Sequence, residues 1–113
     1  MHRRAATDDV FLAIADPTRR AILHRLAEGE RTAGELASQF PSSASAVSQH
    51  LAVLRDAGLV NVRSQGRQRI YALRPIPLRR VAQWVSHYER FWNERLDALG
   101  EHLDRLKEEE EGP

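Results

Sequence analysis

Residues 43–58, SASAVSQHLAVLRDAG, constrain the fold more than any other segment of the chain. Val47, Leu51 and Leu54 recur at positions i, i+4 and i+7, which is the spacing of the buried stripe on an amphipathic helix. Gly58 follows the last of these residues and is suited to end a helix. The spacing therefore predicts one helix, about four turns long, whose aliphatic side packs into a core.

A second face of the same predicted helix carries Ser45, Ser48, Gln49 and Ala52. Small side chains let a helix enter the major groove of DNA, where Ser and Gln hydrogen-bond base edges or phosphates. The N-terminal amides of the helix also favour phosphate. The opposing interpretation is that serines gather at a helix start because they cap it. The face on its own is compatible with both.

A short helix is predicted just before this one. Thr32 is a suitable N-cap, and Glu35 three residues later completes a capping box for a helix over 33–39. Pro41 then breaks the chain, and Ser42 or Ser43 can cap the next helix. Two short helices joined by a tight turn, the second with a polar face, indicate a helix-turn-helix.

The rest of the chain predicts three further helices and a hairpin. Asp16, Pro17 and Gly29 bound one helix as N-cap, first residue and stop. The fold class is mainly α with a small β-hairpin, in a single domain over 1–113 with a core at 8–77, a long last helix at 78–107 and an acidic tail at 108–113. The predicted helices are 9–15, 17–28, 33–39, 43–57 and 78–107, and the predicted strands are 59–63 and 69–73.

The predicted hairpin has a basic tip. Arg63, Arg67 and Arg69 lie in or beside the turn over 64–68. Such a tip can reach a neighbouring minor groove or the sugar–phosphate backbone. The alternative is an ordinary solvated edge. The first interpretation is favoured because the hairpin directly follows the helix with the polar face. Residues 1–80 carry a net charge of +6 and residues 81–113 carry −5, so the front of the chain is basic and the back is acidic.

Composition excludes several classes of protein. The chain contains no cysteine, so disulfides, thiolate metal sites and a cysteine nucleophile are excluded. It has no membrane-length apolar run, so we expect a cytoplasmic protein without a membrane partner. Ser48 and His50 are two residues apart on a helix and point in different directions. With no phosphate-binding loop and no nucleophile–base pattern, we expect no enzyme and no cofactor.

The last predicted helix carries many apolar residues at helical spacing, including Tyr88, Trp92 and Leu96. So much apolar surface needs covering, which favours a dimer interface. Two successive spacings of four, from Tyr88 to Leu96, indicate packing without a long regular coiled coil. A small organic ligand held between two such helices is the alternative.

Four segments together resemble the ArsR (arsenic-repressor-like) winged-helix transcription factors. They are DPTRRAIL at 16–23, ELA at 35–37, AVSQHLAVLRDAGLV at 46–60 and GRQRIYAL at 66–73. The resemblance covers roughly residues 8–105, and the run from Ser48 to Val60 is its most specific part. It implies a homodimeric repressor that binds a pseudo-palindromic operator in double-stranded DNA.

The resemblance also implies roles for individual residues. The recognition helix would contact DNA through its polar face, the wing through its arginines, and the second helix through two arginines near phosphates. The first and last helices would form the dimer interface. The implied DNA-contacting residues are Ser43, Ser45, Ser48, Gln49, His50, Arg67, Arg69, Arg19 and Arg20, and the implied interface residues are Phe11, Val85, Tyr88, Trp92, Leu96, Leu99 and Leu103.

The chain departs from the metal-sensing members of that family. Residues 35–39, where some members carry a pair of cysteines, contain no thiol. His87 and His102 lie fifteen residues apart, and no two histidines have the i, i+3 or i+4 spacing of a helical metal site. The resemblance is therefore to the metal-independent branch, with no metal site and an unknown effector. A winged-helix module that binds another protein is the rival function.

Overall fold

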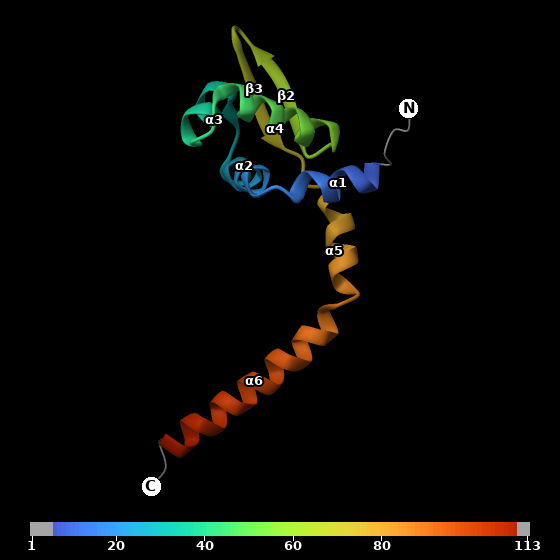
Figure 1. Cartoon of the computed structure of the whole chain (residues 1–113), viewed down its shortest axis with the longest axis vertical. Helices are drawn as coiled ribbons and strands as arrows, with labels where there is room; N and C mark the ends of the chain where they lie inside the picture. The colour runs from blue at the N-terminus through green and yellow to red at the C-terminus, as the bar shows by residue number, and fades with distance from the viewer. Residues whose placement is uncertain (1–5, 111–113) are drawn as a thin grey trace. The chain divides into compact units, whose positions relative to one another are not determined.

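The computed structural model describes residues 6–110, which divide into two compact units, one up to Val81 and the other from Ala82 onward. The first unit is a winged helix-turn-helix, mostly helical with a small antiparallel sheet, as predicted. Figure 1 shows its helices grouped beside a hairpin that projects away from them. Its elements are α1 (Ala6–Ile14), α2 (Pro17–Glu28), β1 (Arg31–Thr32), α3 (Ala33–Gln39), α4 (Ala44–Asp56), β2 (Val60–Gln65) and β3 (Gln68–Leu73).

Local capping explains where three of these helices begin. Asp16 caps α2 by accepting a hydrogen bond from the Arg19 N–H at 3.0 Å, which lowers the pKa of the Asp16 carboxyl. Thr32 and Glu35 form the predicted capping box of α3, and the bond from the Thr32 N–H lowers the pKa of Glu35. Because these caps use the ionised carboxylates, their contribution is present above the usual carboxyl pKa and is lost as the pH falls through the lowered one. Ser43 caps α4 by accepting from the Ala46 N–H at 3.1 Å.

The core lies where α1, α2, α3 and α4 meet the base of the sheet. Val47, Leu51 and Leu54 of α4 are each at most 2% exposed, so the predicted aliphatic stripe is the buried one. Phe40, at the end of α3, is half-buried against this core. The other core side chains come from every neighbouring element. They are Val10, Ala13, Ile22, Leu23, Leu26, Leu36, Ala57, Leu59, Val60 and Tyr71.

The sheet contains a strand that the sequence analysis did not predict. Its order is β1-β3-β2, with β1 antiparallel to β3 through the pairs Arg31–Tyr71 and Thr32–Ile70. The hairpin strands also run closer to the turn than expected, because Gln65 pairs directly with Gln68. Gly66 takes φ +62° at the first turn position, the conformation that a tight type II′ hairpin turn favours and that suits glycine.

The predicted continuous helix over 78–107 is wrong, because the structure has α5 (Leu78–Ser86) and α6 (Glu89–Glu110) with a break between them. At the break the Gln83 carbonyl accepts from the Ser86 hydroxyl at 2.6 Å and faces the His87 ring at 2.9 Å. The backbone N–H of His87 turns instead to the carbonyl of Trp84 at 3.2 Å. Side chains thus take the acceptor that the next helical bond would need, which ends α5.

Two helix ends also differ from the sequence-based expectation. The first helix starts at Ala6, three residues earlier than predicted. The last helix includes Glu108–Glu110, which were expected in a frayed tail, while residues 111–113 lie outside the described residues. Within residues 6–110, none of the helices combines the length and the apolar character needed to cross a bilayer.

Candidate nucleic-acid interface

The polar face of α4 is open to solvent. Ser45, Ser48, Gln49 and Ala52 are exposed, while the aliphatic stripe of the same helix is buried. Ser45 lies in the first turn of α4, where the free backbone N–H groups favour anions, and the other exposed residues lie in the next two turns. We call Ser45, Ser48, Gln49 and Ala52 the recognition face. It offers two hydroxyls and one amide, all able both to donate and to accept hydrogen bonds.

Arg69 lies on the side of the hairpin that faces α4. Side chains alternate along a strand, so Arg69 shares a face with Tyr71, which is buried against the core. Its guanidinium lies over the Tyr71 ring, 5.8 Å from the centroid, a cation–π geometry that holds the charge beside the recognition face. The face of β3 that carries the buried Tyr71 therefore also carries Arg69, beside the recognition face.

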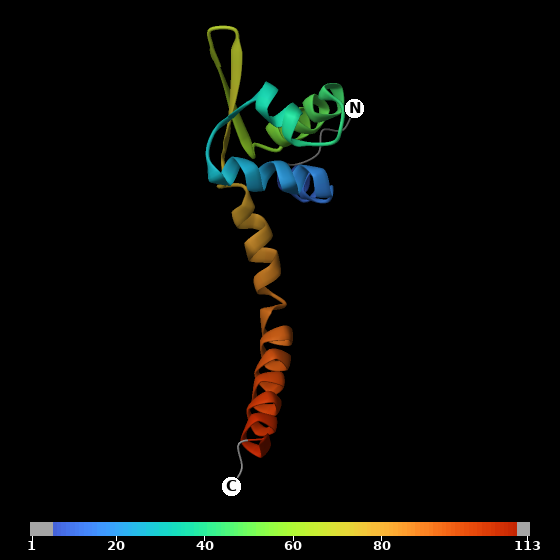
Figure 2. The same ribbon diagram turned by 90° about the vertical axis from the view of Figure 1, so that its left-hand side faces the viewer.

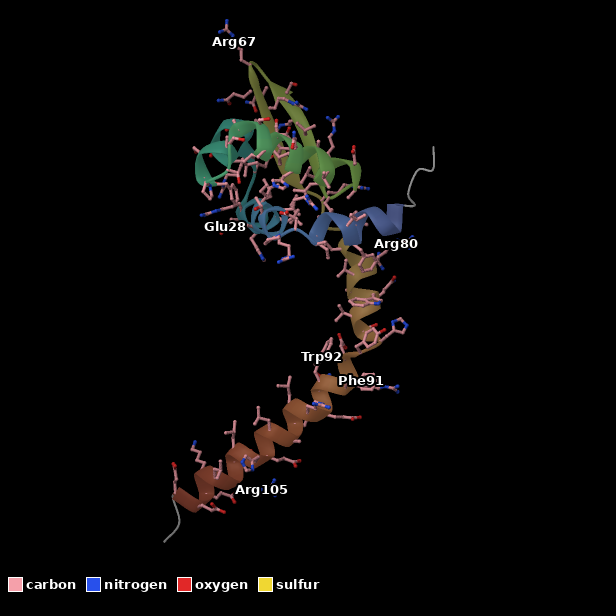
Figure 3. The ribbon with its side chains drawn as sticks, viewed as in Figure 1. Glu28, Arg67, Arg80, Phe91, Trp92 and Arg105 are labelled. Atoms are coloured by element: carbon pink, nitrogen blue, oxygen red, sulfur yellow. The ribbon has the colours of Figure 1, made fainter. Side chains whose placement is uncertain are left out.

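The other two hairpin arginines differ in their surroundings. Arg67 is the second residue of the turn, is exposed, and projects from the tip of the hairpin (Figure 3). Arg63 instead forms a bidentate ion pair with Glu30, in the loop before β1. The sequence analysis grouped these three arginines together. Within the described residues, Arg63 forms a salt bridge, whereas Arg67 and Arg69 form none.

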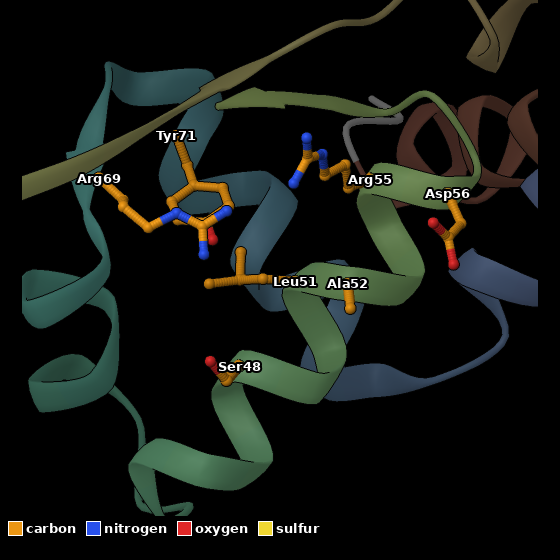
Figure 4. A pocket seen from close by; sticks show the side chains of 7 residues that line it. All are labelled: Ser48, Leu51, Ala52, Arg55, Asp56, Arg69 and Tyr71. Carbon is orange, nitrogen blue, oxygen red and sulfur yellow. The ribbon is translucent and has the colours of Figure 1, made fainter. Parts of the chain in front are cut away.

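A groove of about 490 Å³ separates α4 from β3. Figure 4 shows the Arg69 guanidinium across the face of the Tyr71 ring, Ser48 on α4 below it, Arg55 pointing toward Tyr71, and Asp56 at the end of α4. Leu51 and Ala52 complete the lining. Two guanidinium groups facing one groove make it suitable for a phosphate backbone that passes between helix and wing.

Arg55 was not among the predicted site residues, although its signal was present. Ser48, Ala52 and Arg55 follow one another at i, i+4 and i+7, so the stripe that bears the recognition face continues to Arg55. Its position in the last turn of α4 makes it an exposed cation near the helix C-terminus. Extending the i, i+4, i+7 spacing of the polar face to the end of the helix would have predicted Arg55 as a site residue.

Arg19, predicted to lie near phosphates, braces α1 against α4 in this structure. Its guanidinium donates to the carbonyls of Ala13 at 2.7 Å and Leu12 at 3.0 Å, and contacts His50 Nδ1 at 3.3 Å. This contact ties the second turn of α4 to the start of α2. His50 is half-buried and lies beside the recognition face rather than on it.

Arg20 and Ser43 are placed differently from each other. Arg20 is exposed and donates one bond, to the Ile14 carbonyl at 2.8 Å, which leaves its other N–H groups available. Ser43 is exposed, and its hydroxyl oxygen accepts the capping bond from Ala46 while its proton remains available as a donor. Both can contact phosphate without losing these bonds.

The predicted interface residues fall into two groups by exposure. Phe11 is half-buried against the core of the first unit, and Val85 is half-buried on α5. The remaining five, at or after the break that ends α5, are between 43% and 59% exposed. They are Tyr88, Trp92, Leu96, Leu99 and Leu103. Within residues 6–110, no three His, Asp or Glu side chains gather closely enough to hold a metal ion.

Known proteins resemble this chain in both sequence and structure. A family described as a helix-turn-helix domain matches residues 14–63. The HTH-type transcriptional regulator Rv2034 of Mycobacterium tuberculosis is 44% identical over 97 residues, which cover 86% of this chain and 88% of that protein. The transcriptional repressor SdpR of Bacillus subtilis is 36% identical, covering 72% of this chain and 90% of SdpR.

Solved structures agree with these relatives. The crystal structure of an ArsR family transcriptional regulator, RHA00566, matches with a TM-score of 0.70 and 35% identity, covering 79% of this chain and 98% of that one. The residues matched by the helix-turn-helix family include all of α3 and α4. The chain belongs to the ArsR family of helix-turn-helix transcriptional regulators, which bind DNA.

Proposed function

We propose that this chain is a homodimeric repressor that binds a pseudo-palindromic operator and blocks access to the promoter. The observation that carries the proposal is the exposed recognition face of α4 beside the unpaired arginines of the wing. In such a dimer, two recognition helices enter successive major grooves about one helical turn, roughly 34 Å, apart. The relative SdpR is itself described as a transcriptional repressor.

The side chains around the groove have distinct tasks in this proposal. Gln49 and Ser48 contact base edges and supply sequence specificity, whereas Arg67, Arg69 and Arg55 contact phosphates and set the register of the protein on the duplex. Arg19 acts by bracing α1 and by holding the His50 ring beside the recognition face.

The proposed regulator acts without a metal effector. The chain has no cysteine, and the His and carboxylate side chains of the described residues do not form a cluster of metal ligands. Thiolate, imidazole and carboxylate groups at close spacing are what a divalent transition metal requires. We propose that the chain belongs to the metal-independent branch of the family, with an effector of unknown identity.

Substitution of Gln49 by alanine is expected to weaken operator binding by at least about 30-fold, because a good amide–base contact is worth about 1–3 kcal/mol of discrimination and the homodimer loses two. Affinity for random duplex is expected to change far less, since the phosphate contacts remain. The operator is first isolated by selecting genomic fragments that the protein binds, and both affinities are then measured by electrophoretic titration. Gln83→Ala, an exposed glutamine on α5, is the matched control. Equal losses on both DNAs would contradict base contact by Gln49.

Substitution of Arg67 by alanine is expected to reduce the salt dependence of DNA binding. Each phosphate contact contributes about 0.9 to the slope of log K against log salt, so a dimer that loses two contacts loses roughly 1.8. Arg63→Gln is the matched control, because Arg63 is paired with Glu30 and should change the slope less. A DNA-independent, salt-insensitive association with another protein would instead support the rival protein-binding module.

A further inference from the structure

The wing, formed by β2 and β3, carries arginines on both of its faces. Arg69 and Tyr71 share one face, which we call the inner face because Tyr71 is buried against the core. Arg63 pairs with Ile70, which alternates with these two residues, so Arg63 lies on the opposite, outer face. Figure 2 shows α3 and α4 together on one side of the hairpin, so the outer face looks away from the recognition helix.

The Arg63 side chain crosses β3 to reach Glu30. β1 pairs with β3 and not with β2, and the register of β1 and β3 places Glu30 beside Ala72. Arg63 itself pairs with Ile70, which is two residues nearer the hairpin tip than Ala72. Its Nη1 and Nη2 atoms donate to the two carboxylate oxygens of Glu30, the second at 3.3 Å. The ion pair thus draws the charge of Arg63 away from the tip and toward the base of the wing.

The ion pair between Glu30 and Arg63 matters more for charge than for stability. The two side chains are 50% and 52% exposed, and exposed ion pairs contribute little to folding. The hairpin is already held by the backbone pairing of β2 with β3 along its whole length. The pair does, however, neutralise one of the three arginines that the wing carries. Its main consequence is therefore on what the wing can attract.

A free Arg63 would be within reach of DNA that the wing tip touches. Gln65 and Gln68 form the last pair of the hairpin, so Arg63 lies two residues, roughly 7 Å, behind that pair. The minor groove is about 6 Å wide and about 7.5 Å deep, so a tip placed at it has a phosphate strand on each side. Arg69 faces the strand on the inner side, and Arg63 would face the strand on the outer side.

We propose that Glu30 lowers the affinity of this protein for DNA by occupying Arg63 in the place that a phosphate would take. A carboxylate and a phosphate bind a guanidinium in the same bidentate way, and Glu30 is tethered next to its arginine. The charge of Glu30 also repels phosphates that approach the outer face. Neutralising Glu30 therefore adds one phosphate contact per protomer. The inference rests on the DNA-binding role of the wing in the proposed function, and it requires neither a particular operator nor repression.

Binding of a random duplex by four proteins tests this proposal. They are the parent chain, Glu30→Gln, Arg63→Gln and the double variant, each titrated by fluorescence anisotropy between roughly 50 and 200 mM salt. Glu30→Gln is expected to bind on the order of fivefold more tightly per protomer at the lowest salt, and its slope of log K against log salt is expected to steepen by about 0.9 per protomer. Arg63→Gln and the double variant are expected to stay within about twofold of the parent, because neither has a released arginine.

The double variant separates the release of Arg63 from a general change in charge. An equal gain from Glu30→Gln with and without Arg63 would overturn the proposal, as would weaker binding by Glu30→Gln, which a strut that holds the hairpin predicts. Glu94→Gln, which removes the same charge from an exposed position on α6, is the matched control and is expected to leave the affinity unchanged. Thermal unfolding of the same samples reports any loss of fold.

Titration of the selected operator alongside the random duplex distinguishes this inference from the proposed repressor. If the parent binds the operator and Glu30→Gln gains nothing on random duplex, the role of Glu30 is overturned and the repressor stands. If Glu30→Gln gains affinity as expected but no genomic fragment is bound in preference to random duplex, the repressor is overturned and the role of Glu30 stands. Absence of DNA binding by all the variants would overturn both.

Discussion

Replacing Leu99 with glutamate is expected to convert the proposed homodimer to monomers at micromolar concentrations and to weaken operator binding by about 100-fold or more. A symmetric interface would have to bury two unpaired carboxylates, which costs several kcal/mol. About 2.7 kcal/mol already corresponds to a hundredfold change in the dimer dissociation constant. A monomer also loses the second half-site contact, and with it the gain from joining two binding sites. Sedimentation velocity and operator titration measure the two effects.

Leu99→Glu should leave the first unit folded, because Leu99 is 51% exposed and is not part of the core cluster. The matched control is Ala98→Glu, which adds the same charge one residue away, off the apolar stripe formed by Leu96, Leu99 and Leu103. It is expected to remain dimeric. Dimers of Leu99→Glu with unchanged affinity would show that the interface lies on another surface.

The helices of the first unit could be predicted closely because short-range chemistry determines their ends. Asp16, Thr32 and Ser43 each accept a bond from a backbone N–H three residues ahead, and such contacts involve only neighbours in the sequence. The buried stripe of α4 follows from helical periodicity in the same way. These features needed no knowledge of the tertiary fold.

Two features, β1 and the break that ends α5, were not predicted because they depend on contacts that the pattern of apolar residues does not show. β1 is two residues long and polar, so it has no alternation to detect, and it exists only because β3 offers an edge. The break that ends α5 depends on the Ser86 hydroxyl taking the Gln83 carbonyl, a choice that the apolar spacing through this region conceals.

In the candidate site, too, the features set by helical periodicity were predicted and those set by long-range contacts were not. Exposure of Ser45, Ser48 and Gln49 was predicted from periodicity, and the structure confirms that exposure. The bracing role of Arg19 was not predicted, because its partners Leu12, Ala13 and His50 lie six to thirty-one residues away. The sequence alone does not show whether a long arginine side chain will hydrogen-bond to backbone carbonyls or stay in solvent.

Truncation of Leu54 to alanine is the substitution expected to cost the first unit most. Leu54 is fully buried in the stripe that anchors α4, and its carbonyl accepts from the Leu59 N–H at 2.9 Å where the chain turns into the wing. Buried leucine truncations cost about 2–5 kcal/mol, so we expect the free energy of unfolding to fall by about 3 kcal/mol. The total free energy of unfolding of a small domain is only about 5–15 kcal/mol. DNA binding should therefore weaken steeply with temperature as the recognition helix detaches.

The measurement is urea unfolding followed by circular dichroism in the Leu99→Glu background, because dimerisation would otherwise add a concentration-dependent term to the stability. Val53→Ala is the matched control, since Val53 is the adjacent residue of α4 and is 38% exposed. Its expected effect is within about 0.5 kcal/mol of zero, as for most surface substitutions. If both variants lost the same stability, the aliphatic stripe would not be what holds α4 in place. The outward direction of the recognition face, which depends on that anchoring, would then lose its physical basis.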